Sequence, residues 1–290
     1  MSLRLAKRIA GAVKPLDPAS NAIQERVRSA VANAPDGVRN ALDGTLLGVP
    51  LHPALTDVPI GSWTAAVALD AVESAAPSPA LRNAADGALA VGVLGALPAA
   101  VTGLADWRDL QGTSRRVGTA HAILNTTGLA LNVTSLALRT AGRRNPARAL
   151  SGIAFLTSTF AAHLGGQLSF GLGIRVNRTA WETPRRDFTP VLDEEELVGT
   201  ELRRVDVGGV GVLITRSESG ELCALSSTCT HLGGPLADGS REGDTVVCPW
   251  HGSRFDLRSG DVVGGPAVFP QPRYEARVNA GTIEVRPAER

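Results

Sequence analysis

Cysteine is scarce in this chain of 290 residues, which contains only Cys223, Cys229 and Cys248. So few cysteines argue against a disulfide framework and are typical of a protein in a reducing compartment. Cys223 lies in the apolar run 222–225, which predicts a buried strand position for it. The other two cysteines each stand close to a histidine, and this pairing is the first candidate for a functional site.

A strong charge of one sign is also missing, because the formal net charge is only +1. A balance so close to zero argues against a nucleic acid or another polyanion as a partner. Lysine occurs only as Lys7 and Lys14, so arginine supplies nearly all of the positive charge. This bias, with abundant alanine and glycine, indicates a bacterial protein from a GC-rich genome. No apolar region follows the basic N-terminus, so we expect no signal peptide.

Charged residues are absent from three long stretches in the middle of the chain. These are residues 87–105, 117–138 and 149–174. Each is about as long as the roughly 20 apolar residues that cross a bilayer. A fourth, weaker candidate at 54–72 contains two aspartates. A soluble helical bundle is the alternative, but membrane helices use such small residues for close packing. We therefore predict a four-helix transmembrane bundle over residues 46–175.

The positions of the basic residues predict the orientation of this bundle. With the N-terminus inside, fourteen Lys and Arg residues flank the helices on the inner side and five on the outer side. This balance predicts a multi-pass protein of the bacterial inner membrane with both termini in the cytoplasm. Residues 1–45 are polar to amphipathic and should form either an interfacial helix or a flexible arm. A helix over 22–42 would place four apolar residues on one side: Ile23, Val27, Val31 and Val38.

The pattern changes after an Arg- and Pro-rich segment, 176–190, which we interpret as a linker. Short apolar runs, such as 202–205 and 210–214, are separated by turns rich in Gly and Asp. This spacing predicts a small all-β domain over residues 191–287. The expected fold class is therefore multidomain α + β, with the helical bundle first and the β domain second.

The strongest signal in this C-terminal part is a pair of Cys–His motifs. The sequence CTH at 229–231 is followed, after sixteen residues, by CPWH at 248–251. Two Cys and two His suit a [2Fe–2S] cluster in which the cysteines bind one iron and the histidines the other. Structural zinc is the alternative, although zinc sites usually pair like with like along the sequence. One Cys and one His in each motif let each loop reach both irons.

The surrounding sequences, CTHLGGPL and CPWHGS, resemble those of the Rieske iron–sulfur family. The resemblance covers residues 191–287 and implies a [2Fe–2S] cluster as cofactor and one-electron transfer as function. It also implies the ligands, which are Cys229 and Cys248 for the inner iron and His231 and His251 for the outer iron. Six further residues should surround the cluster without binding it: Gly233, Gly234, Trp250, Ser253, Phe255 and Pro266. No catalytic residue is expected beside them.

The sequence differs from the respiratory members of this family at several positions, and these differences indicate another branch of the family. Those members carry an extra cysteine in each loop, but Gly234 and Trp250 stand at these positions, so their disulfide cannot form. Phe255 replaces a tyrosine whose hydroxyl raises the cluster potential, while Ser253 is retained. A complete Rieske oxygenase would need a second iron site, yet only 39 residues follow His251 and none is a histidine. The site resembles the ferredoxin- and oxygenase-linked branch.

The helical part, residues 45–180, resembles a bacterial four-helix membrane domain of unknown function. The matching sequences are LHP at 51–53, VPIG at 58–61, GLADW at 103–107, AHA at 120–122 and GG at 165–166. In relatives a histidine usually follows the paired glycines, but Gln167 stands here and His163 lies one turn earlier. Polar groups in such helices should face the bundle interior, because they are costly in hydrocarbon. They are His52, Asp57, Asp70, His121, Asn125, Asn132, His163 and Gln167.

Two interpretations of these polar residues stay open. They either hydrogen-bond between helices, or they form a haem b or quinone site that includes His52, His121 and His163. His52 and His121 are the best candidates for the two axial imidazole ligands of a haem, because both are expected near the same end of the bundle.

Three functions follow from the two resemblances. The first is a membrane-anchored Rieske protein that carries single electrons on the cytoplasmic face, with a redox protein or a quinone as partner. The second is a redox or iron sensor whose cluster controls the membrane module. The third is the anchored ferredoxin component of an oxygenase or reductase. The sequence offers no independent catalytic site, so any oxidoreductase role would be that of an electron-transfer component.

Overall fold

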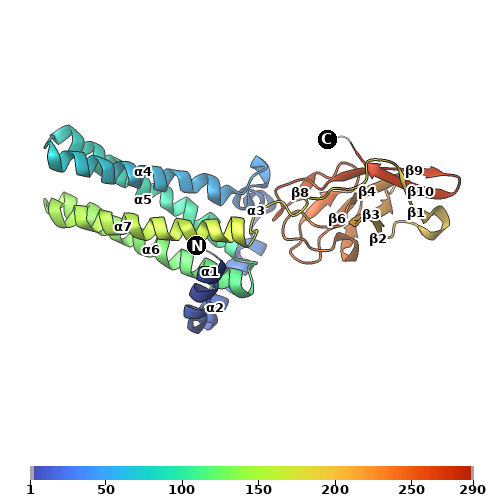
Figure 1. Ribbon diagram of the computed structural model, residues 1–290, viewed down its shortest axis with the longest axis horizontal. Coiled ribbons are helices and arrows are strands. Elements are labelled where there is room, and N and C mark those ends of the chain that lie inside the picture. Colours follow the sequence, from blue (N-terminus) through green and yellow to red (C-terminus); the bar gives the residue numbers. More distant parts are fainter. Residues whose placement is uncertain (1–2, 289–290) are drawn as a thin grey trace. The chain divides into compact units, whose positions relative to one another are not determined.

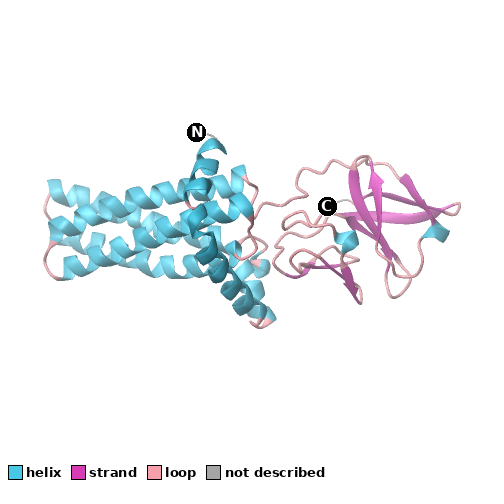
Figure 2. Ribbon diagram, turned by 90° about the horizontal axis from the view of Figure 1, so that it is seen from below, coloured by secondary structure: helices cyan, strands magenta, loops and turns pink. Residues whose placement is uncertain are grey.

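The computed structural model describes residues 3–288, so the expectations for Met1 and Ser2 within segment 1–45 lie outside the described residues. The chain divides into two compact units. Unit 1 combines the helices up to Asn33 with Leu51–Ile174, and unit 2 combines Ala34–Pro50 with the chain from Arg175 onward. Unit 1 is helical, and all of the described strands belong to unit 2 (Figures 1 and 2). The expected order of a helical part and an all-β part is confirmed.

Four long antiparallel helices form unit 1 (Figure 2). They are α4 (Leu51–Ala75), α5 (Pro79–Trp107), α6 (Gly112–Thr140) and α7 (Arg144–Gly166). The turns between them are only three or four residues long, which forces consecutive helices to lie side by side. α4 packs mainly on α5 and α6 on α7, while α5–α6 and α4–α7 contacts close the bundle. A short π-helix, Gln167–Gly171, follows α7.

The uncharged stretches coincide with these helices, and the expected four-helix bundle is present. Within the described residues, α5 alone is both long and apolar enough to cross a membrane. The other three helices do not meet this criterion; α4 carries Asp70 and Glu73, and α7 carries Arg144 and Arg148 in its first two turns. Membrane crossing by all four helices therefore stays a prediction.

A buried network of charged side chains explains several of these residues. Arg139 of α6 binds Asp70 of α4 through Nη2, and its Nη1 lies 2.6 Å from Asp86 Oδ1 of α5. Asp70 and Asn132 are buried, as expected for polar groups facing the interior. Asp57 is exposed, so the same expectation is wrong for it. Thirteen residues separate it from Asp70, which places it on a different side of the helix.

The N-terminal segment forms three short helices instead of one continuous helix over 22–42. They are α1 (Leu3–Ala12), α2 (Asp17–Ala32) and α3 (Asp36–Asp43), with 3₁₀ turns at Lys14–Leu16 and Thr45–Leu47. Pro35 interrupts the helix, because the residue before a proline avoids the helical conformation. Ile23, Val27 and Val31 follow one another at intervals of four residues on α2, whereas Val38 belongs to α3. Ile23 is 50% exposed, and Gln24 beside it is buried. Gln24 Nε2 donates to the carbonyls of Trp107 and Leu110 at 2.9 and 2.8 Å.

Unit 2 contains two antiparallel sheets. The strands of the first run in the order β1-β10-β9-β4-β3-β2, and those of the second in the order β5-β6-β7-β8. The strands are β1 (Thr189–Asp193), β2 (Arg203–Val207), β3 (Val210–Arg216), β4 (Leu222–Ser226), β5 (Ser240–Glu242), β6 (Thr245–Val247), β7 (Arg254–Asp256), β8 (Val262–Gly264), β9 (Arg273–Asn279) and β10 (Thr282–Pro287). The expected all-β domain is therefore observed.

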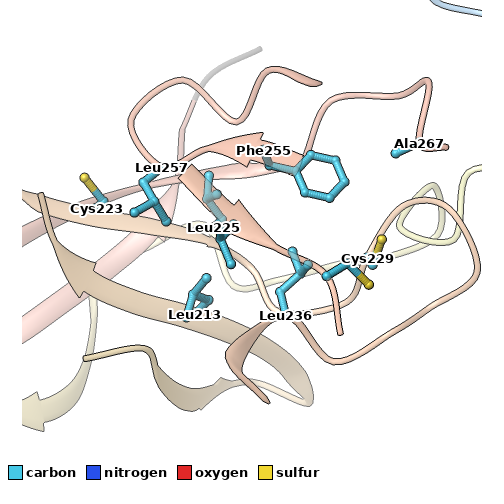
Figure 3. Packing of buried hydrophobic residues seen from close by; sticks show 10 residues of the cluster. Leu213, Cys223, Leu225, Cys229, Leu236, Phe255, Leu257 and Ala267 are labelled. Atoms are coloured by element: carbon cyan, nitrogen blue, oxygen red, sulfur yellow. The ribbon is translucent and has the colours of Figure 1, made fainter. Parts of the chain in front are cut away.

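Alternating residues of β3 and β4 supply two separate cores. Val212 and Ile214 contribute to one apolar cluster, whereas Leu213 contributes to the other. Successive strand residues point to opposite faces, so both faces of this sheet are covered. The cluster around Leu213 also contains Cys229 and Cys248. Figure 3 shows Cys229 beside Leu236 at one end of this core and Cys223 at the other.

Cys223 and the predicted linker both belong to the β domain. Cys223 is buried in β4, as expected, and burial raises the pKa of its thiol to about 11. The segment 176–188 contains no helix or strand but lies against the domain. The Arg178 amide donates to the Thr230 carbonyl at 3.1 Å, and Ser226 Oγ donates to Glu182 Oε1 at 3.0 Å. The segment is thus fixed along the β domain.

Candidate metal centre

The two Cys–His motifs lie in loops with the same backbone geometry. In each loop the cysteine amide donates to the carbonyl five residues later, and the amide four residues later donates back to the cysteine carbonyl. The first loop has Cys229 to Gly234 at 2.8 Å and Gly233 to Cys229 at 2.9 Å, and the second has Cys248 to Ser253 at 2.8 Å and Gly252 to Cys248 at 3.0 Å. Gly233 and Gly252 have φ of 83° and 73°, a region that favours glycine.

The four predicted ligands meet as two like pairs across the loops. The Cys229 and Cys248 side chains are hydrogen-bonded to each other. The rings of His231 and His251 have centroids 5.2 Å apart and stand nearly perpendicular. Cysteine therefore pairs with cysteine and histidine with histidine, although each loop carries one of each. A [2Fe–2S] centre with thiolates on one iron and imidazoles on the other requires this division.

The two thiols lie together in a buried place, and the hydrogen bond between them shifts the pKa of each. The hydrogen bond from Cys229 lowers the pKa of Cys248 to about 6, and the amides of Trp250 and His251 lower it further. The same hydrogen bond, followed by burial, raises the pKa of Cys229. Metal ligands must be thiolates, so an iron that displaces the proton of this hydrogen bond gains two soft anionic donors at one point. The donor set thus fits an iron–sulfur centre.

Burial changes from one end of the site to the other. Cys229 is 1% exposed and Cys248 is 3% exposed, while His251 is half-buried. Trp250, beside it, is 56% exposed. The sulfur end therefore lies inside the core. At the imidazole end His231 is also buried, at 9% exposed, and His251 is the ligand nearest the surface.

The expected surrounding residues take up different roles. A Cβ on Gly234 would lie 2.8 Å from Cys248 Sγ, so only glycine lets this backbone approach the sulfur. Ser253 Oγ accepts the Ala267 amide at 3.1 Å, and its hydroxyl bonds to Cys229. Phe255 is fully buried in the core, and Pro266 lines a small pocket next to His231.

Residues 36–47 also contact the cluster site, which sequence reasoning missed. Asn40 Oδ1 accepts the Gly265 amide at 3.0 Å, and Thr45 Oγ1 donates to the Ala267 carbonyl at 3.2 Å. These contacts hold the loop that contains Pro266. The contacts join residues more than 220 positions apart, and no local sequence pattern signals such a pairing.

Comparisons with known proteins agree with this geometry. The Rieske [2Fe-2S] domain family matches residues 187–275. The chain is 31% identical over 84 residues to ferredoxin CarAc of Metapseudomonas resinovorans, covering 29% of this chain and 78% of that protein. This chain belongs to the Rieske [2Fe-2S] domain family. Its cofactor is accordingly the [2Fe–2S] cluster that such a domain implies, and electron transfer is its general chemistry.

Further relatives share only the Rieske domain. The chain is 30% identical to the ferredoxin component of the p-cumate 2,3-dioxygenase system of Pseudomonas putida, covering 34% of this chain and 85% of that protein. It is 29% identical to mouse apoptosis-inducing factor 3, covering 32% of this chain but only 15% of that protein. A solved structure, the ferredoxin of carbazole 1,9a-dioxygenase from Nocardioides aromaticivorans IC177, is 28% identical with a TM-score of 0.33, covering 35% of this chain and 98% of that one.

The second family match lies in unit 1. Residues 48–178 match the family described as predicted membrane protein (DUF2231). Unit 1 brings together two of the three histidines considered for a second site, since the rings of His52 and His121 have centroids 6.2 Å apart. His163 stacks on Phe160 instead, with ring centroids 6.4 Å apart.

Proposed function

We propose that this chain is a membrane-anchored Rieske protein that passes single electrons through a cluster bound by Cys229, Cys248, His231 and His251. The pairing of the two cysteines and of the two histidines supports this assignment most strongly. A bound [2Fe–2S] centre supplies one-electron chemistry whose potential rises when imidazoles replace thiolates. The residues of the chain hold the ligands, exclude water from the sulfur end and leave the imidazole end accessible.

The exposed end of the site provides the route to a partner. His251 is half-buried and Trp250 is 56% exposed, so a docked protein can approach the histidine-bound iron closely. Aromatic side chains are enriched where proteins meet. Electron transfer there needs proximity only, and no acid or base among the described residues has to act. A redox protein is therefore the proposed partner.

A ferredoxin-like potential is the second part of the proposal. Phe255 is buried at the position where respiratory members carry a tyrosine, so this hydroxyl cannot donate to the cluster. Fewer hydrogen bonds to sulfur lower the potential. Two of the relatives are ferredoxins, one of them a component of a dioxygenase system. We infer that an oxygenase or reductase system, rather than a quinol-oxidising complex, uses this carrier.

Anchoring through unit 1 is the third part. The match to a predicted membrane family and the apolar length of α5 support insertion. The arginine distribution supports cytoplasmic chain ends. Fractionation of cells and alkaline extraction of the membranes test this part, because an integral protein stays in the membrane pellet.

Electron paramagnetic resonance of the dithionite-reduced, full-length protein tests the ligand assignment. We expect a Rieske signal in the wild type and in Cys223→Ser, whose cysteine lies outside the site. The signal should be lost in Cys229→Ser and His251→Ala while the protein still inserts into membranes. A complete Rieske signal in His251→Ala would falsify the assignment. A change of helix packing with cluster oxidation state would instead favour the sensor function.

A further inference from the structure

Two histidines from different helices meet within unit 1. His52 belongs to the first turn of α4 and His121 to α6. Their ring centroids are 6.2 Å apart and their planes stand at 85°. Both side chains are half-buried in helices that are otherwise rich in Ala, Leu and Gly. Ionisable groups in such helices are costly, so a converging pair requires a specific explanation.

A backbone carbonyl of the neighbouring helix fixes each ring. Nδ1 of His52 lies 2.8 Å from the Ala99 carbonyl oxygen on α5, and Nδ1 of His121 lies 2.8 Å from the Ala161 carbonyl oxygen on α7. A carbonyl can only accept, so each Nδ1 carries a proton, and in the neutral form of the ring the lone pair is on Nε2. The Asn125 amide donates to His121 Nε2 at 3.1 Å, which fixes this tautomer for His121, and a metal bound at Nε2 would have to replace this hydrogen bond. Metal-binding histidines are commonly fixed in this way.

Glycines make room for both rings at equivalent positions. Gly103 lies four residues after Ala99, and Gly165 lies four residues after Ala161. A Cβ on Gly103 would lie 2.9 Å from His52 Cε1, and a Cβ on Gly165 would lie 3.2 Å from His121 Cε1. The hairpins α4–α5 and α6–α7 thus repeat one arrangement, and their histidines meet between them. Binding sites of repeat-built membrane proteins lie at such interfaces.

The distance between the rings fits a shared metal. A metal bound by Nε2 at about 2.0 Å lies roughly 3 Å from the centre of the imidazole ring. Two rings on opposite sides of one metal therefore have centres about 6 Å apart, close to the 6.2 Å found here. Neutral imidazoles suit copper, zinc and iron, and haem iron also accepts them as axial ligands.

We propose that His52 and His121 together bind one transition-metal centre through their Nε2 atoms, either as a metal ion or as the iron of a haem. His163 takes no part in it. It lies two residues after Ala161, which places it on another side of α7 from the Ala161 and Gly165 face that meets His121. The site lies wholly in unit 1, so it is independent of the cluster ligands.

Metal and haem content of the full-length protein test this proposal. The protein is purified in detergent without a histidine tag, and its metals are measured by mass spectrometry alongside visible spectra before and after dithionite. Copper, zinc and haemin are then each titrated into it. We expect the wild type to bind about one equivalent of copper, zinc or haemin. His52→Ala and His121→Ala should each bind it about tenfold more weakly or worse. His163→Ala is the matched control and should bind like the wild type.

A haem and a metal ion give different results in these measurements. Haem produces sharp visible bands, whereas a metal ion appears only in the elemental analysis. His52→Gln and His121→Gln serve as second variants, because a glutamine amide can still donate to the helix carbonyl while offering no imidazole. Equal binding, or no binding, in the wild type and in both histidine variants would overturn the proposal. The Rieske signal of the same samples reports separately on the cluster in unit 2.

Discussion

Asp43 and Arg175 form a buried ion pair next to the loop that covers the cluster site, although 132 residues separate them. Asp43 Oδ1 lies 3.5 Å from Arg175 Nη2, and the two side chains are 2% and 7% exposed. Arg175 also donates to the carbonyls of Pro266 at 2.7 Å and Asp43 at 2.9 Å. These contacts hold Arg175 in the left-handed region, with φ of 60°, which costs a non-glycine residue on the order of 1–3 kcal/mol.

Removing the charge of Asp43 should loosen this loop. Breaking one partner of a buried pair costs about 3–5 kcal/mol, because the other charge stays buried. We therefore expect Asp43→Asn to bleach the visible absorption of the cluster at a lower temperature than the wild type. Asp36→Asn is the matched control on the same helix, since Asp36 is 74% exposed and pairs only with a neighbour. Equal bleaching temperatures for the two variants would show that the ion pair does not support the site.

Ser253 should raise the reduction potential of the cluster. Its hydroxyl is fully buried, accepts the Ala267 amide and bonds to Cys229. A hydrogen bond to a charged group contributes about 1.5–3 kcal/mol, which corresponds to roughly 60–130 mV for one electron. We expect Ser253→Ala to lower the midpoint potential by an amount in this range, measured by redox titration with resonance detection. Ser259→Ala, in an exposed turn, should leave it unchanged.

The sequence indicates the two Cys–His loops but not the contacts around them, for a physical reason. Ligand spacing, strand alternation and uncharged runs are local, so they identified the Cys–His loops, the β domain and the helices. The contacts between residues 36–47 and the loop that contains Pro266 join distant parts of the chain, and so does the Asp70–Arg139 ion pair. Burial of Asp70 follows from its place in an apolar run, but nothing in the sequence identifies Arg139 as its partner, or Gly265 and Ala267 as the partners of Asn40 and Thr45. These residues meet only when the chain folds, and no periodic pattern in the sequence indicates such a contact.

Arg139 should be the most sensitive charged residue of unit 1. Its side chain is 1% exposed and joins Asp70 and Asp86 on two other helices. Truncating it removes the most buried cation of this network, while Asp70 keeps Arg144 at 3.3 Å and Arg148 at 3.6 Å. We therefore expect a cost below the about 3–5 kcal/mol of an isolated buried pair. We expect Arg139→Ala to unfold at a clearly lower temperature in detergent, followed by circular dichroism of the helices. Asp57→Ala, at an exposed position of α4, should unfold like the wild type; an equal loss in both would contradict the network.

Glu182 should make unit 2 less stable as the pH rises. Burial raises the pKa of Glu182, against hydrogen bonds from Ser226 and Thr228 that lower it. The folded state therefore binds the proton more tightly than the unfolded state. The protonated Glu182 carboxyl therefore contributes fully to stability below the ordinary pKa of a glutamate. This contribution is lost as the pH rises through the raised pKa of the folded state.

Glu182→Gln stays neutral at every pH and isolates this contribution. We expect the stability difference between the variant and the wild type to be smallest in acid and to shift in favour of the variant towards neutral pH. Thermal unfolding of the β domain, followed through cluster absorption at a series of pH values, measures it. Glu195→Gln is the control, because Glu195 is exposed and should shift the curve equally at all pH values. Parallel curves for Glu182→Gln and the wild type would mean that the pKa of the carboxyl is the same in the folded and unfolded states.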